Sequence, residues 1–111
     1  MIKNRTSKII NGRAYTDRDT ALLTDLPLHQ QQIVIGWIKG NIVHRKSPNY
    51  NYTSYSIKHW IQGIFHIYLT NNQFKDAMLM CGFYPINEKV LNWHYCISEK
   101  SPAFINGEVY V

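Results

Sequence analysis

Two stretches in the second half of the chain carry apolar residues at the spacing of an amphipathic helix. In each, the apolar positions recur at i, i+3, i+4 and i+7, which places them on one helical face. They are Ile57, Trp60, Ile61 and Ile64 in the first stretch, and Phe74, Ala77, Met78 and Cys81 in the second. Thr53 or Ser54 can cap the first helix and Thr70 the second, and Gly82 suits a C-terminal end. The sequence therefore predicts two short helices within residues 53–82.

Two helices in this order are typical of a helix-turn-helix, although the connection expected here, about residues 65–71, is longer than the tightest examples have. Alternating apolar residues at 91, 93, 95 and 97 predict a strand, so residues 83–98 are expected to form a small hairpin in the position of a wing. If the second helix entered a major groove, Asn72 and Lys75 on its polar face would contact bases or phosphates.

The remainder of the chain predicts one α+β domain over residues 1–111, mostly helical, with a winged helix-turn-helix-like scaffold and a small β-hairpin. Residues 1–15 contain a turn at Asn11-Gly12 and form either a basic arm or two short strands, at residues 1–3 and 8–10, on either side of a polar link. Thr16 begins a short helix signal, and apolar periodicity predicts a long helix over about 27–44. After residue 104 we expect an Asn-Gly turn and one further short strand or extension. A chain of 111 residues can bury one core without disulfides or metal.

Charge is distributed unevenly along the chain. The net charge is +5, and residues 1–50 hold eight basic and three acidic groups whereas residues 51–111 hold four of each. The whole positive excess therefore belongs to the first half, and an electropositive surface attracts polyanions. The alternative is a solvated basic surface that only aids solubility.

A basic loop rich in tyrosine, residues 45–55, links the long helix to the predicted helix-turn-helix unit. Lysine and arginine neutralise phosphates, and exposed tyrosine rings stack on bases of any identity. Cations at the C-terminal end of a helix also complement its dipole, and any one tyrosine could fold back onto the core. The candidate nucleic-acid-binding residues are Lys39, Arg45, Lys46, Tyr50, Tyr52, Tyr55, Lys58, Asn72 and Lys75.

No signature of catalysis or metal binding occurs in the sequence. The five histidines lack a metal-binding or triad spacing, and neither a P-loop nor a nucleophile motif is present. Cys81 and Cys96 lack zinc-site spacing and are expected to be reduced and buried. We therefore expect no enzymatic activity, no metal and no cofactor. Without a signal-like or membrane-spanning apolar run, the expected location is the cytoplasm, away from membranes.

Several segments in the second half of the chain form a recognisable combination. They are Tyr52 to Tyr55, Lys58, Trp60, Tyr68 to Met78, Gly82 to Pro85 and Leu91 to Tyr95. Together they resemble a family of small proteins from mobile genetic elements of low-GC Gram-positive bacteria. Within that group the chain is similar to the single-stranded DNA-binding proteins of staphylococcal cassette chromosome elements. The resemblance covers roughly residues 50–97 and implies a scaffold derived from a winged helix-turn-helix, not an OB-fold, with single-stranded DNA as ligand.

Three functions stay open from the sequence. The first is sequence-tolerant, non-catalytic binding of single-stranded DNA in replication or transfer of a mobile element. For this function, replication proteins of that element are candidate partners and a homodimer is a candidate assembly. The second is a winged helix-turn-helix regulator that binds duplex DNA. The third is a protein-binding accessory subunit or inhibitor whose aromatic residues form a protein interface.

Overall fold

The computed structural model describes residues 6–106, and this part of the chain begins with a two-stranded antiparallel hairpin. The hairpin joins β1 (Ser7–Ile10) to β2 (Arg13–Thr16). Asn11 and Gly12 between them have φ angles of 51° and 78°, as a two-residue type I′ turn requires. The predicted Asn11-Gly12 turn is confirmed, and residues 7–16 form strands. The other expected strand, at residues 1–3, lies outside the described residues.

The helix predicted to begin at Thr16 does not form. Residues 17–22 are irregular, and a single 3-10 turn, η1 (Leu23–Asp25), follows them. The Asp19 carboxylate accepts from the backbone N–H of Ala21 at 3.3 Å and from that of Asn72 at 3.0 Å. The Asp19 carboxylate therefore binds the N-terminus of the later helix that begins at Asn71, and it caps no helix of its own. A short acidic side chain can also bond backbone groups in non-helical conformations.

The other predicted helices are confirmed with shifted ends. They are α1 (Leu28–Asn41), α2 (Ser54–Phe65) and α3 (Asn71–Met80). The caps are those expected, since Thr53 accepts from the N–H of Ser56 and Thr70 from that of Gln73. Gly82, with a φ of 86°, follows the end of α3 as predicted. A fourth helix, α4 (Pro102–Asn106), replaces part of the expected C-terminal extension, and residues 107–111 lie outside the described range.

A second pair of strands joins two distant parts of the chain. β3 (His44–Asn49) pairs antiparallel with β4 (Tyr95–Ile97), with a register irregularity between its two paired ends. The hairpin expected within residues 83–98 is therefore wrong in its main pairing, since Pro85 contributes only an isolated bridge to Tyr95. Residues 45–49, which were expected to lie in the basic loop over residues 45–55, are part of β3. The Asn49 side chain donates to the carbonyl of Ile97, which is 48 positions away, and local sequence does not show such a contact.

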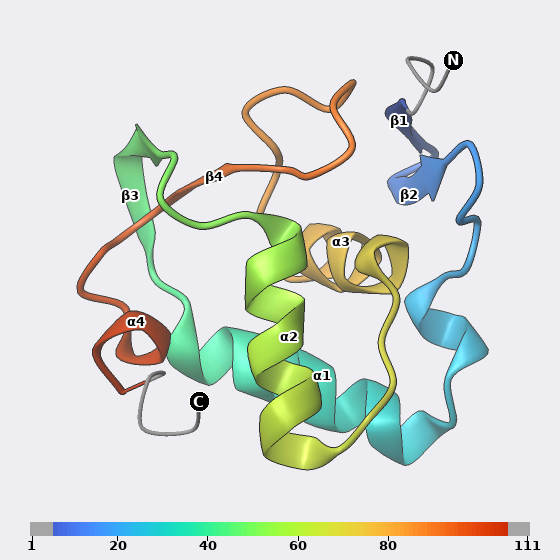
Figure 1. Cartoon of the computed structure of the whole chain (residues 1–111), viewed down its shortest axis with the longest axis horizontal. Helices are drawn as coiled ribbons and strands as arrows, with labels where there is room; N and C mark the ends of the chain where they lie inside the picture. The colour runs from blue at the N-terminus through green and yellow to red at the C-terminus, as the bar shows by residue number, and fades with distance from the viewer. Residues whose placement is uncertain (1–5, 107–111) are drawn as a thin grey trace.

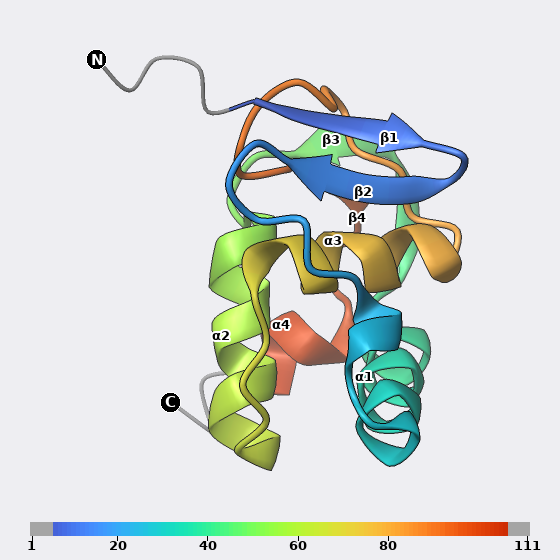
Figure 2. The ribbon, with the colours of Figure 1, turned by 90° about the vertical axis from the view of Figure 1, so that its right-hand side faces the viewer.

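Helix α3 lies at the centre of the molecule. Figure 2 shows the β1–β2 hairpin above α3 and α1 below it, and Figure 1 shows β3 on the other side of α2 from that hairpin. Every residue from 72 to 79 is buried. The expectation that α3 presents an exposed polar face is therefore wrong, because the hairpin and η1 cover that face. Over residues 6–106 the fold is α+β, with four α-helices and a small antiparallel hairpin.

Candidate nucleic-acid interface

The structure divides the nine candidate residues by exposure. Four are exposed, two are half-buried and three are buried. The exposed ones are Lys39, Lys46, Tyr50 and Tyr55; the half-buried ones are Arg45 and Tyr52; the buried ones are Lys58, Asn72 and Lys75. Only the first group and Arg45 can meet a ligand without a rearrangement of the core.

Lys75 is a structural cation. Its side chain is fully buried, and its Nζ donates to Ser7 Oγ and Thr16 Oγ1 at 2.9 Å and to the Leu91 carbonyl at 3.1 Å. It also lies 4.7 Å from the centroid of the Trp93 ring. Burial lowers the pKa of Lys75 to about 8, an effect that the Asp19 carboxylate partly opposes. The interpretation of Lys75 as a phosphate contact is wrong, because it holds β1, β2 and the segment before β4 on α3.

Asn72 has a similar internal role. Its Nδ2 donates to the carbonyls of Ala14 and Ala21 at 2.7 Å, and its Oδ1 accepts from Thr16 Oγ1 at 3.1 Å. All of its amide atoms therefore face the hairpin and the segment that follows it. The prediction that Asn72 reads a base edge is wrong for the same reason as for Lys75.

Two further candidates pack inward. The Tyr52 ring stacks on Phe104, with centroids 3.7 Å apart and planes 2° apart, and meets the edge of Trp60. Lys58 is 7% exposed, and its Nζ donates to Gln62 Oε1 at 2.9 Å. Burial lowers the pKa of Lys58, and Asp19 opposes this shift. Neither residue is an open contact for a ligand, and the alternative that a tyrosine folds onto the core applies to Tyr52.

The exposed candidates do not all share one face. Lys39 lies on α1 in an apolar groove with Leu28 and Met80. Met80 ends α3 whereas Asn71 begins it, so the two lie about 14 Å apart along the helix axis. Lys39 therefore belongs to the end of α3 that is far from Asn71.

Arg45, Lys46 and Tyr50 lie on β3 and directly after it. The Arg45 guanidinium donates to the carbonyls of Ser47 at 3.0 Å and Pro48 at 2.6 Å, so it braces its own strand. Lys46 is exposed and forms no ion pair within the described part of the chain. The Tyr50 ring is 64% exposed and meets the edge of His94 at 5.2 Å between centroids.

Two hydrogen bonds connect this region to the start of α2. The N–H of Ser54 donates to the Trp93 carbonyl at 2.8 Å, and the N–H of Trp93 donates to Ser54 Oγ at 3.0 Å. Tyr55 follows Ser54 and Asn92 precedes Trp93, so these two bonds fix their backbones side by side. Tyr50, whose ring contacts His94, and Tyr55 are therefore both held next to residues 92–94 at the start of α2, and we call the exposed side chains of these two tyrosines the tyrosine surface.

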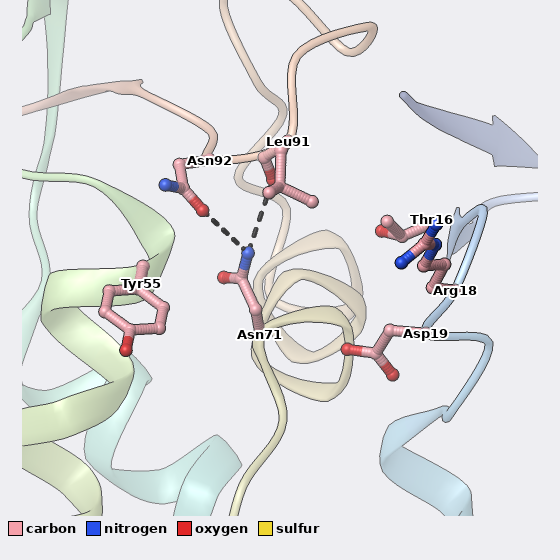
Figure 3. A pocket seen from close by; sticks show the side chains of 7 residues that line it. All are labelled: Thr16, Arg18, Asp19, Tyr55, Asn71, Leu91 and Asn92. Carbon is pink, nitrogen blue, oxygen red and sulfur yellow. Dashed lines mark hydrogen bonds between the residues drawn. The ribbon is translucent and has the colours of Figure 1, made fainter. Parts of the chain in front are cut away.

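Tyr55 and Asn92 line a pocket of about 320 Å³ where the starts of α2 and α3 meet the loop after β2. Figure 3 shows Tyr55 and Asn71 on one side, Arg18 and Asp19 on the other, and Leu91 and Asn92 above. The other lining residue is Thr16. Arg18 and Asn92 are absent from the sequence-based candidates. Arg18 lies between two aspartates that suggested a helix start, and the Asn71–Asn92 bond joins residues 21 positions apart, which periodicity does not report.

Other kinds of site find no support in the described residues. Among residues 6–106 no three histidine, cysteine or carboxylate side chains are grouped closely enough to hold a metal ion. Cys81 and Cys96 are free thiols, and burial raises the pKa of Cys81. No helix within the described range has the length and apolar character needed to cross a membrane.

Comparisons with protein-family models, with curated proteins and with solved structures found no match. The function is therefore argued from the geometry of the chain itself.

Proposed function

We propose that this protein binds single-stranded DNA without sequence preference and without catalysis, in support of the replication or transfer of a mobile element. One observation carries the proposal: the side chains of Tyr50 and Tyr55 are exposed, and both lie in the stretch that runs from the basic strand β3, with Arg45 and Lys46, to the first turn of α2. Stacking rings and cations on one surface are the features that sequence-tolerant strand binding needs. The expected resemblance of residues 50–97 to mobile-element proteins, which no comparison tests, is part of the same proposal.

Duplex DNA is the less favoured ligand. A winged helix-turn-helix would present its second helix to the major groove, but residues 72–79 of α3 are buried under the hairpin. A scaffold descended from a winged helix-turn-helix stays compatible with the α2–α3 order, provided that another surface contacts the ligand. Selection of a palindromic site from a random duplex library would favour the regulator instead.

Protein binding is the second candidate function, and a specific feature favours it. The groove on α1 exposes Leu28 to 68% and Met80 to 50%, and large exposed apolar side chains are common at protein interfaces. This groove lies away from the tyrosine surface. If the full chain retained no nucleic acid at low salt, the protein-binding function would become the better proposal.

The first test is a salt series of fluorescence anisotropy titrations with oligo-dT, random duplex and single-stranded RNA. Oligo-dT should bind more tightly than duplex, and the plot of log K against log salt should be steep because cations displace counterions from phosphates. Lys46→Ala should flatten that slope by about 0.7, the value for one phosphate contact on a single strand.

Lys39→Ala is the matched control, since it removes the same charge from an exposed lysine on α1, away from the tyrosine surface. It should leave the slope unchanged within error. Equal or tighter binding to random duplex, or equal slopes for wild type and Lys46→Ala, would contradict the proposed surface.

A further inference from the structure

The pocket at the start of α2 and α3 contains a polar atom that the protein leaves without a partner. Asn71 Nδ2 donates to the Leu91 carbonyl at 3.3 Å and to Asn92 Oδ1 at 3.0 Å, and these bonds fix the orientation of the amide. Asn71 Oδ1 is then buried and accepts no hydrogen bond from any described residue. Figure 3 shows it pointing toward Tyr55. A buried acceptor without a donor is unfavourable, so a ligand N–H group that displaces the side chains covering this oxygen gains a hydrogen bond that the described residues do not supply.

An aromatic ring stands beside that acceptor. Tyr55 is 48% exposed and lines the pocket from the first turn of α2. His59 meets it edge-on at 4.5 Å, and Lys58 Nζ lies 5.0 Å from its centroid, so the ring is held in place by its neighbours. A fixed ring beside a fixed acceptor suits a planar ligand that has a hydrogen-bond donor on its edge.

On the opposite wall of the pocket, a negative side chain is part of the wall and a positive side chain is exposed to solvent. Asp19 has both carboxylate oxygens engaged, one by the N–H of Ala21 and the other by that of Asn72, so it is part of the wall. Its negative charge disfavours a phosphate inside the pocket. Arg18 is exposed, and within residues 6–106 its guanidinium has no ion-pair partner. A neutral ring inside and a phosphate outside, next to Arg18, fit this arrangement.

The size of the pocket also limits the ligand. Its volume of about 320 Å³ is at the lower end of the range for small-molecule sites. We infer that the pocket receives one unstacked nucleobase of a bound single strand, with its ring against Tyr55, an N–H of its Watson–Crick edge donating to Asn71 Oδ1, and a neighbouring phosphate near Arg18. This inference deepens the single-stranded DNA proposal and rests on it.

The test compares oligo-dT with a strand of the same length made of abasic deoxyribose phosphate. Wild-type protein should bind oligo-dT about tenfold or more tightly than the abasic strand, since stacking on a protein ring favours bases. Tyr55→Leu should reduce this ratio toward one, whereas Tyr55→Phe should keep it because it keeps the ring. Tyr55 is half exposed, so both variants should fold, and far-ultraviolet circular dichroism checks this.

A second comparison addresses Asn71. Oligo-dT methylated at N3 keeps its rings but has no N–H to donate on the base edge, so wild type should bind it about fivefold or more weakly than oligo-dT. Asn71→Ala should bind the two strands equally, since the acceptor is gone. Lys39→Ala should behave like wild type, because its side chain lies in the groove on α1.

The outcomes separate the two proposals. If wild type binds oligo-dT and the abasic strand equally, strand binding stands but the pocket does not receive a base. If wild type discriminates against the abasic strand but Tyr55→Leu and Asn71→Ala do so equally well, bases are bound elsewhere and the inference is wrong. If oligo-dT does not bind at low salt, both proposals are wrong.

Discussion

Asp76→Ala is expected to lower the free energy of unfolding by about 3–5 kcal/mol, the range for breaking a buried ion pair. The Asp76 side chain is fully buried. It accepts two bonds from the Arg13 guanidinium, at 2.8 and 2.7 Å, and one from the N–H of Leu23 at 2.9 Å. The N–H of Ala14 is a longer contact at 3.4 Å. Alanine would leave buried backbone donors without an acceptor and a guanidinium without its counter-charge.

Urea unfolding followed by tryptophan fluorescence measures this loss. Glu88→Ala is the matched control, because Glu88 is an exposed carboxylate whose one backbone contact, to Ile9, is 3.3 Å long. It should change the free energy of unfolding by less than about 1 kcal/mol. A loss below about 1 kcal/mol for Asp76→Ala would show that the buried ion pair does not hold the hairpin and η1 on α3.

The sequence predicted helix α3 itself but not that the hairpin covers its polar side, where Asp76 lies. Apolar periodicity predicted the helix and Thr70 predicted its start, since both depend on residues within one or two turns. Lys75 and Asp76 lie on the polar side of that pattern, and such a side is expected to be exposed to solvent. Their partners, Ser7 and Arg13, are 68 and 63 positions away, so local spacing does not show that a hairpin covers this side.

For the candidate site as well, the sequence predicted the features that depend on nearby residues but not those that depend on distant contacts. The exposed tyrosines Tyr50 and Tyr55 were identified from composition near a basic segment, which is a local signal. Whether a given ring faces outward depends on distant partners, and Tyr52 turns inward because Phe104 stacks on it. The pocket is lined by four segments that are far apart in the sequence, and two of these segments contribute Arg18 and Asn92. A pattern within one segment therefore predicted the rings but not the pocket.

Lys75 should make stability rise with pH above about 8. Burial lowers its pKa to about 8 in the folded protein, from about 10.5 for an ordinary lysine. Between these two values the unfolded chain binds a proton that the folded chain has released, so raising the pH favours the folded state. Integrated over the interval between the two values, this contribution is on the order of 1–3 kcal/mol. Below pH 8 both states are protonated and the contribution is constant.

Two other buried groups act in the opposite direction. Burial raises the pKa of Cys81 and, more strongly, that of Tyr95, so each disfavours the folded state as pH rises through the ionisation range of the unfolded chain. The measured quantity must therefore be a difference between proteins that share these groups. Lys75→Met keeps the length and apolar stem of the side chain and removes the charge, whereas Cys81 and Tyr95 stay in both proteins.

The free energy of unfolding, measured by urea titration at several pH values from about 7 to 9.5, should rise for wild type relative to Lys75→Met by about 1–2 kcal/mol above pH 8. Lys46→Met, at an exposed lysine, should follow wild type. Parallel curves for wild type and Lys75→Met would mean that Lys75 keeps an ordinary pKa.

The same loss of a proton from Lys75 should also affect the pocket. Thr16 and Leu91 both accept hydrogen bonds from Lys75 and both line the pocket, so the loss weakens the contacts that hold these two pocket walls together. Discrimination between oligo-dT and the abasic strand should therefore decrease above pH 8 in wild type, even as the fold itself becomes more stable.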